Sequence, residues 1–327
     1  MAHLVSIVMY HYVRPLKSSR YPEIKGLERD LFKEQIAYIK KHYNVIGAKE
    51  LMDRIEHGTP LPPNALMLSF DDGYIDHFLH VYPLLKEQGL SALFFPPAKS
   101  ILEHQVLDVN KIHFVLASVA NKGKLLEEIH TMLDQNRHLY DLESNEHYWQ
   151  RLGRANRFDS AEVVFIKRML QRELPMPLRQ KIVDQLFCRH VTSDEVAFAQ
   201  ELYMNMDQIA HLQRDGMYIG NHGFNHHWLN AIAQEEQAQE IELSLRFLDR
   251  LGADTDRWIM CYPYGAYNAS LLSLLHKYGC VAGLTTQVGI SNLQHDNPLT
   301  LPRLDTNDLP KDACAKPNLW TQQAISA

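Results

Sequence analysis

Two neighbouring carboxylates stand directly after a short apolar run of the sequence. The run is Ala65-Leu66-Met67-Leu68-Ser69-Phe70, and Asp71-Asp72-Gly73 follows it at once. Ligands bind at the carboxyl ends of the strands in α/β folds, so one carboxylate could bind a cation while the other stays free as a base. Aspartate and glycine are also common turn formers, and a plain Asp-Asp-Gly turn explains the same residues without any chemistry.

A pair of histidines, His222 and His226, follows a second strand candidate at 217–220. Histidines at this spacing face the same side of a helical turn and can share one ion. Two imidazoles and one carboxylate form a standard ligand set for catalytic zinc, which leaves a coordination position open for water. The chain contains 18 histidines, so such a pair also arises by chance, and His227 offers an alternative second ligand.

The third candidate is the run Tyr262-Pro263-Tyr264-Gly265, which follows a predicted strand at 257–260. A turn of this kind at a strand end exposes backbone N–H groups, and these could stabilise an oxyanion. A turn without a chemical role is the competing interpretation.

The elements that must position these residues alternate between strand and helix. Short apolar runs predict strands at 5–11, 65–70, 92–95, 217–220, 257–260 and 281–286. Helical periodicity predicts helices over 30–43, 76–88, 206–215, 233–251 and 268–279. This alternation is typical of a parallel α/β sheet or barrel. Each candidate follows a predicted strand, so we expect all three on the same rim.

The alternation is interrupted over residues 101–203, where helical periodicity dominates. We therefore predict an α/β domain formed by 1–100 and 204–310, a helical insertion over 101–203 and a C-terminal tail over 311–327. The insertion could roof a cleft or form a dimer contact, so a homo-oligomer is among the expected partners.

Composition excludes several classes of protein. The 327 residues include 33 basic and 39 acidic side chains, and the formal charge of −6 argues against a nucleic-acid binder. No run approaches the roughly 18 apolar residues of a membrane span. The first six residues lack the features of a signal peptide, so we expect a cytoplasmic protein unless a leader has been removed. The four cysteines form no Cys-x-x-Cys pair, which excludes a zinc ribbon.

Taken in order, the motifs resemble those of the polysaccharide deacetylase family, carbohydrate esterase family 4. That family has Thr/Ser-Phe-Asp-Asp-Gly, His-Ser/Thr-x-x-His and Arg-x-Pro-Tyr motifs. The matching residues here are Ser69-Phe70-Asp71-Asp72-Gly73, His222-Gly223-Phe224-Asn225-His226 and Cys261-Tyr262-Pro263-Tyr264. The opening Met9-Tyr10-His11-Tyr12-Val13 is similar to the branch that includes the biofilm poly-N-acetylglucosamine deacetylases. The resemblance covers residues 1–100 and 205–305.

The resemblance implies an irregular (β/α)7-type barrel with a helical insertion, and a divalent metal ion, expected to be zinc. It assigns Asp72, His222 and His226 as metal ligands and Asp71 as the general base. The backbone N–H of Tyr264 would help to hold the oxyanion. His11 would be the general acid, and the alternative for His11 is a structural histidine hydrogen-bonded beneath the sheet.

The sequence departs from the family pattern at two positions. Gly223 stands where the family has serine or threonine, so a hydroxyl that would order the histidine loop is missing. Cys261 stands where the family has an arginine that orients the catalytic aspartate. We hypothesise that Arg303 supplies this positive charge instead.

The expected function is metal-dependent removal of an N-acetyl group from an N-acetylated sugar or oligosaccharide. The expected process is cell-surface polysaccharide biosynthesis, such as that of O-antigen or capsule, on a nucleotide-linked or lipid-linked precursor. The alternatives are another amide hydrolase, such as a sugar deformylase, and a catalytically silent carbohydrate-binding protein. An added structural or interaction role for the helical insertion also stays open.

Overall fold

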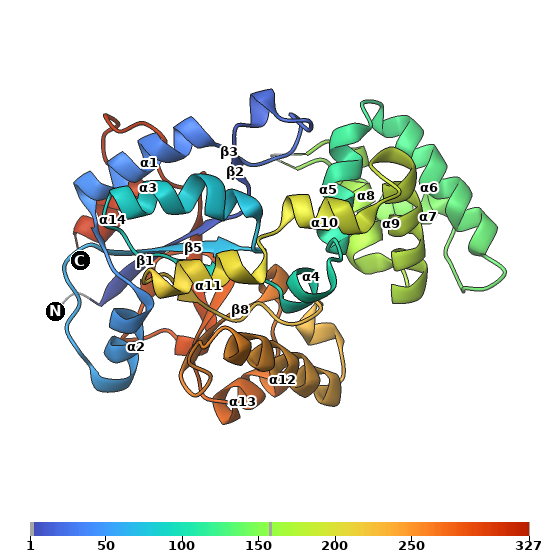
Figure 1. Cartoon of the computed structure of the whole chain (residues 1–327). Coiled ribbons are helices and arrows are strands. Elements are labelled where there is room, and N and C mark those ends of the chain that lie inside the picture. The colour runs from blue at the N-terminus through green and yellow to red at the C-terminus, as the bar shows by residue number, and fades with distance from the viewer. Residues whose placement is uncertain (1–2, 157–158, 327) are drawn as a thin grey trace. The chain divides into compact units, whose positions relative to one another are not determined.

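A computed structural model of the chain describes residues 3–156 and 159–326. The chain divides into two compact units, each drawn in Figure 1. The first, here called the barrel unit, comprises Met1–Pro15, Gly26–Gln105 and Ala199–Ala327. The second, here called the helical unit, comprises Leu16–Lys25 and Val106–Phe198. The segment Leu16–Lys25 thus joins helices that lie far from it in the sequence, which no local pattern could indicate.

The barrel unit is built on a nine-stranded sheet, in which seven strands follow the order β7-β6-β5-β1-β11-β9-β8. Every neighbouring pair along this order is parallel. The seven strands are β1 (Leu4–Tyr10), β5 (Ala65–Asp71), β6 (Leu93–Phe95), β7 (Tyr218–Ile219), β8 (Trp258–Cys261), β9 (Cys280–Val288) and β11 (Leu301–Asp305). Two short strands lie off this path: β4 (Asn44–Val45) pairs with β5, and β10 (Ser291–Asn292) pairs antiparallel with β1.

Asn221, two residues after β7, joins the two ends of this strand order. Its backbone N–H donates to the carbonyl oxygen of Ile259 at 3.1 Å, and the N–H of Cys261 donates to the carbonyl oxygen of Asn221 at 2.8 Å. Both partners lie in β8, the last strand in the order, and Asn221 extends β7, the first strand. These hydrogen bonds therefore connect the two ends of the strand order. The predicted α/β class with an irregular (β/α) barrel is confirmed.

Alternate residues of the strands form one apolar cluster in the barrel unit. Side chains alternate between the two faces of a strand, so one parity of each strand contributes to this cluster. Its strand members are Val5, Ile7, Ala65, Met67, Leu93, Phe95, Ile259, Cys261, Ala282, Leu284 and Leu301. Residues of the other parity pack against the covering helices. Phe70, for example, stacks on Tyr10 at a centroid distance of 4.8 Å and lies edge-on to Phe32 of helix α1 (Arg29–His42).

The helices predicted for the barrel unit are present close to their predicted ranges, whereas the helices Ala48–His57 and Ala98–Glu103 were not predicted. They are α1 (Arg29–His42), α2 (Ala48–His57), α3 (Tyr82–Glu87), α4 (Ala98–Glu103), α11 (Met206–Arg214), α12 (Gln234–Arg250), α13 (Ala269–Lys277) and α14 (Leu319–Ile325). The helix predicted over 76–88 begins as a π-helix, η2 (His77–Val81), before α3 continues it. Helix α14 was not predicted; Tyr38 and Tyr43 both hydrogen-bond its buried Thr321.

The helical unit contains α5 (Asp108–Ser118), α6 (Lys122–Asn136), α7 (Asn145–Leu152), α8 (Ala161–Arg168) and α9 (Met176–His190), and α10 (Glu195–Leu202) runs from this unit into the barrel unit. Its core contains apolar residues at helical spacing, such as Leu125 and Ile129 of α6. Lys111 is buried there between the carboxylates of Asp184 and Glu195. Across the described ranges 3–156 and 159–326, no helix has both the length and the apolar composition that a membrane span requires.

Candidate active site

The strand parity of the barrel explains why charged residues meet at one end of it. Asp71 is the last residue of β5 and has the same parity as Ala65 and Met67 in the apolar cluster. Arg303 of β11 has the parity of Leu301 in the same way. The seven strands of the main order are parallel, so their carboxyl ends lie together, and polar side chains of interior parity near those ends face one another.

Asp72, His222 and His226 form a compact, buried group. The Nε2 atoms of both histidines lie 3.3 Å from the same oxygen, Oδ1 of Asp72. One ligand atom from each of the three residues lies within 4.8 Å of the other two, which is the spacing of a shared metal ion. The tertiary structure therefore brings together the three residues that the sequence predicted as ligands, although Asp72 precedes His222 by 150 residues.

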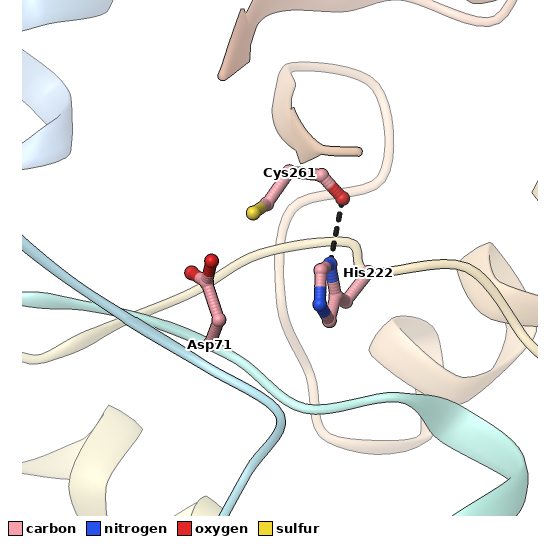
Figure 2. A group of neighbouring side chains, drawn as sticks. All are labelled: Asp71, His222 and Cys261. Atoms are coloured by element: carbon pink, nitrogen blue, oxygen red, sulfur yellow. Dashed lines mark hydrogen bonds between the residues drawn. The ribbon is translucent and has the colours of Figure 1, made fainter. Parts of the chain in front are cut away.

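A carbonyl group sets the tautomer of His222, and Figure 2 shows the hydrogen bond that joins this imidazole to Cys261. Nδ1 of His222 lies 2.7 Å from the backbone oxygen of Cys261. A carbonyl oxygen can only accept, so Nδ1 carries the proton and Nε2 is the nitrogen that faces Asp72. A metal-ligating histidine usually makes such a second hydrogen bond.

The electrostatics of this group suit a bound cation. Burial opposes the charged form of His222, but the neighbouring Cys261 and the hydrogen bond to Asp72 raise its pKa well above the ordinary value, so a bound cation would have to displace a proton from this imidazole. Burial lowers the pKa of His226, which favours the neutral imidazole that a metal ligand needs. The negative charge of the Asp72 carboxylate, which faces the two Nε2 atoms, would be balanced by a cation bound between the three residues. Two imidazole nitrogens and one carboxylate oxygen are ligand atoms that zinc accepts.

Strained backbone accompanies these residues. Asp72, His226 and Tyr264 have φ values of 70°, 58° and 58°, in the left-handed region that side chains other than glycine rarely adopt. Such residues cost on the order of 1–3 kcal/mol each and cluster at functional sites. The described part of the chain has only two other non-glycine residues of this kind, Asn64 and His104.

Tyr74 was missed by the sequence analysis. Its hydroxyl donates to Oδ2 of Asp72 at 2.5 Å, so that Oδ1 remains for the two histidines. Burial and the nearby Asp72 raise the pKa of Tyr74 well above its usual value, which keeps the phenol protonated as a donor. Its place two residues after Asp72 was the only signal available in the sequence.

Arg303 binds both oxygens of Asp71. Its Nη1 lies 2.9 Å from Oδ1, and its Nη2 lies 2.9 Å from Oδ2. The guanidinium is 1% exposed and is itself held by the carbonyl oxygen of Thr285 and the hydroxyl of Ser69. Burial opposes ionisation of Asp71, but Arg303 outweighs it and lowers the pKa of this carboxyl to about 2. The structure therefore places Arg303 beside the aspartate, as the hypothesis about Cys261 required.

A second group, Asp71 with His222 and Cys261, also has ligand atoms within 4.8 Å of one another (Figure 2). This group is the poorer cation site, because Arg303 already occupies both Asp71 oxygens and would repel a metal ion. Burial also raises the pKa of the Cys261 thiol, whereas a metal binds the thiolate.

His11 also lies near Asp71. Its Nε2 is 4.0 Å from Oδ2 of Asp71, and its side chain is 41% exposed. The alternative of a histidine buried beneath the sheet therefore does not describe it. Two residues that sequence reasoning missed hold its segment: the buried His77 donates from Nε2 to the carbonyl oxygen of His11 at 2.9 Å, and Asp76 accepts from the N–H of Val13 at 3.2 Å.

Tyr264 lies against the metal-ligand candidates. Its ring is edge-on to that of His226 at a centroid distance of 4.8 Å and stacks on Trp228 at 4.4 Å. The left-handed conformation of Tyr264 belongs to the tight turn after β8, in which the N–H of Gly265 donates to the carbonyl oxygen of Tyr262. The candidate residues of all three motifs are thus neighbours in the barrel unit.

We expect His226→Ala to lower zinc affinity by at least about 100-fold, more than the loss of an outer-sphere partner costs. His227→Ala should leave zinc affinity unchanged, because His226 and not His227 faces Asp72. Competition with a chelating dye measures both variants. If the two phenotypes were reversed, the ligand would be displaced by one residue.

Comparison with known proteins gives a segment match and a shared fold. Residues 185–283 match the family model described as polysaccharide deacetylase, a segment that contains both candidate histidines and Tyr264. The Bacillus subtilis (strain 168) protein YxkH, whose name assigns it provisionally to the polysaccharide deacetylases, is 30% identical over 99 residues. This alignment covers 29% of the chain and 32% of YxkH, so the chain matches about a third of that relative's length.

Several solved structures share the fold over nearly the whole chain. The Streptococcus pyogenes deacetylase PplD, in complex with acetate, has a TM-score of 0.58 at 16% identity, covering 100% of this chain and 98% of PplD. IcaB from Ammonifex degensii has a TM-score of 0.56 at 16% identity, covering 98% and 96%. A de-N-acetylase from Aggregatibacter actinomycetemcomitans has a TM-score of 0.56 at 17% identity, covering 98% and 99%. Residues 185–283 thus match the polysaccharide deacetylase family that the motifs resemble, and the chain shares the fold of the solved deacetylases.

Proposed function

We propose that this protein is a metal-dependent hydrolase that removes the acetyl group from an N-acetylated sugar. The observation that carries the proposal is the pairing of two devices at one end of the barrel. One is the Asp72–His222–His226 group, which suits a divalent cation. The other is Asp71, which Arg303 holds ionised beside that group.

Asp71 acts in this proposal as the general base. A carboxylate has about four lone-pair positions, and Arg303 uses one on each oxygen, so each oxygen keeps a position for a water proton. Its low pKa means that Asp71 is ionised at every physiological pH. The bidentate contact also fixes the orientation of the carboxylate, which is the role that the family gives to the arginine missing at Cys261.

His11 and Tyr264 act in the later steps. An amine leaves only when it is protonated, and His11, which is partly exposed and lies 4.0 Å from Asp71, is the group that would protonate it. The backbone N–H of Tyr264 would donate to the oxyanion. A divalent cation held by Asp72, His222 and His226, with zinc as the expected metal, would polarise the amide carbonyl and lower the pKa of water.

The proposed substrate is an N-acetylated sugar or oligosaccharide used in cell-surface polysaccharide assembly, such as that of O-antigen or capsule. Two findings support it: the family is named for polysaccharide deacetylation, and the similar PplD structure holds acetate, the product of such a reaction. A nucleotide-linked or lipid-linked precursor in the cytoplasm is the form we propose to test first.

The test is acetate release from a panel of N-acetylated nucleotide sugars and short N-acetylglucosamine oligomers. We expect release from at least one member with stoichiometric zinc and none in the presence of a chelator. Formate release from an N-formylated sugar instead would identify a deformylase. Tight zinc binding without any release would favour the silent carbohydrate-binding protein.

A further inference from the structure

The loop that carries both candidate histidines has no regular secondary structure, and its motif lacks the hydroxyl residue of the family. Gly223 takes that position with φ 74°, in the left-handed region. An irregular loop leaves backbone N–H groups without helix or strand partners, and buried groups of this kind must be satisfied elsewhere. The partner here is a side chain of α12, Glu240.

Glu240 is 4% exposed and makes three contacts with the loop. Its Oε2 accepts from the N–H of Phe224 at 2.9 Å and from the N–H of Asn225 at 3.0 Å. Its Oε1 accepts from Nδ2 of Asn225. One buried carboxylate thus accepts from the backbone N–H groups of both residues between Gly223 and His226. Hydrogen bonds to a carboxylate are roughly twice as strong as those between neutral groups.

The same turn of α12 also holds the start of the loop. Oδ1 of Asn221 accepts from the N–H of Gly223 at 2.8 Å, and Nδ2 of Asn221 donates to the hydroxyl of Ser244 at 2.8 Å. That hydroxyl donates in turn to the carbonyl oxygen of Glu240 at 2.7 Å. Ser244 of α12 therefore holds the start of the loop through Asn221, and Glu240, four positions earlier in the same helix, holds its middle.

Gly223 fits this arrangement for a steric reason. A Cβ atom added there would lie 3.3 Å from Oε2 of Glu240, closer than most such contacts. The glycine therefore allows the carboxylate of Glu240 to approach the loop closely. In the family a hydroxyl side chain at the position of Gly223 would order the loop from within. Here the buried Glu240 of α12 orders it instead.

We infer that Glu240 is a positioning residue for the metal-binding loop. Its hydrogen bonds to residues 224 and 225 set the backbone from which His226 enters the left-handed conformation and directs Nε2 at Asp72. The inference rests on the proposed function in that the loop binds a metal. It concerns a residue that does not touch metal or substrate.

The test is zinc affinity of the Glu240→Gln variant by competition with a chelating dye. Glutamine keeps the size but removes the charge and one acceptor oxygen, so we expect affinity to fall about 10- to 100-fold, the range for lost outer-sphere partners. The visible absorption spectrum of the Co²⁺-loaded variant should change as well, because ligand geometry changes. A merely structural effect on stability would leave that spectrum as it is.

The matched control is Glu242→Gln on the same helix. Glu242 is exposed and bonds the hydroxyl of Tyr278, so its variant should bind zinc as the wild type does. If Glu240→Gln does not fold, Glu240→Asp, which keeps the charge on a shorter side chain, carries the same test. Equal zinc affinity and an equal Co²⁺ spectrum in wild type and variant would overturn the inference alone. A wild-type chain that binds no zinc would overturn the proposed function, and this inference with it.

Discussion

Asp71→Asn should lose acetate release by about 100- to 10,000-fold, the usual contribution of a positioned general base. Asparagine has nearly the same shape as aspartate but cannot take a proton from water, and its amide group would face the Arg303 guanidinium as a donor against a donor. Zinc content should remain near one per chain, because the three ligand candidates are unchanged. The rate with saturating zinc and the metal content, measured on one preparation, check this expectation.

The neighbouring variant Asp72→Asn is the control for Asp71→Asn. It should lose zinc, because Oδ1 of Asp72 is the oxygen that both histidines face. The assignment of the two adjacent carboxylates would be wrong if Asp71→Asn released the metal and Asp72→Asn kept it. Full activity of Asp71→Asn would place the base elsewhere.

Arg303→Met should destabilise the fold by about 3–5 kcal/mol, the cost of removing one partner of a buried ion pair. Burial alone would then act on Asp71 and raise the pKa of its carboxyl. In the wild type the lowered pKa contributes stability that is present above the unfolded value of 3.8 and is lost as pH falls toward about 2. The variant should lack that contribution. Unfolding free energies between pH 3 and pH 7 measure both effects.

Arg257→Met is the matched control for the Arg303 variant. Arg257 pairs with Asp53 and Glu56 in the same unit, but it is partly exposed, and surface ion pairs contribute about 0–1 kcal/mol. A loss of stability in Arg303→Met no larger than in Arg257→Met would show that the Asp71–Arg303 pair is not what holds this end of the barrel.

Local pattern determined most of the secondary structure, because it depends on neighbours in the chain. The apolar runs at 65–70 and 92–95 became β5 and β6, and the predicted helix over 233–251 became α12 (Gln234–Arg250). The tail helix α14 escaped prediction because its packing partners, Tyr38 and Tyr43, lie far away in sequence.

The sequence by itself determined that chemically active residues stand directly after several predicted strands. The family resemblance assigned roles to these residues, and those roles remain predictions. Only the tertiary structure decided their partners. Arg303 reaches Asp71 because two parallel strands present the same parity at one barrel end. Tyr74 and Glu240 became visible only as hydrogen-bond partners of Asp72 and of the histidine loop. A contact between distant residues depends on where the backbone carries them, and that is a property of the folded chain rather than of any local pattern.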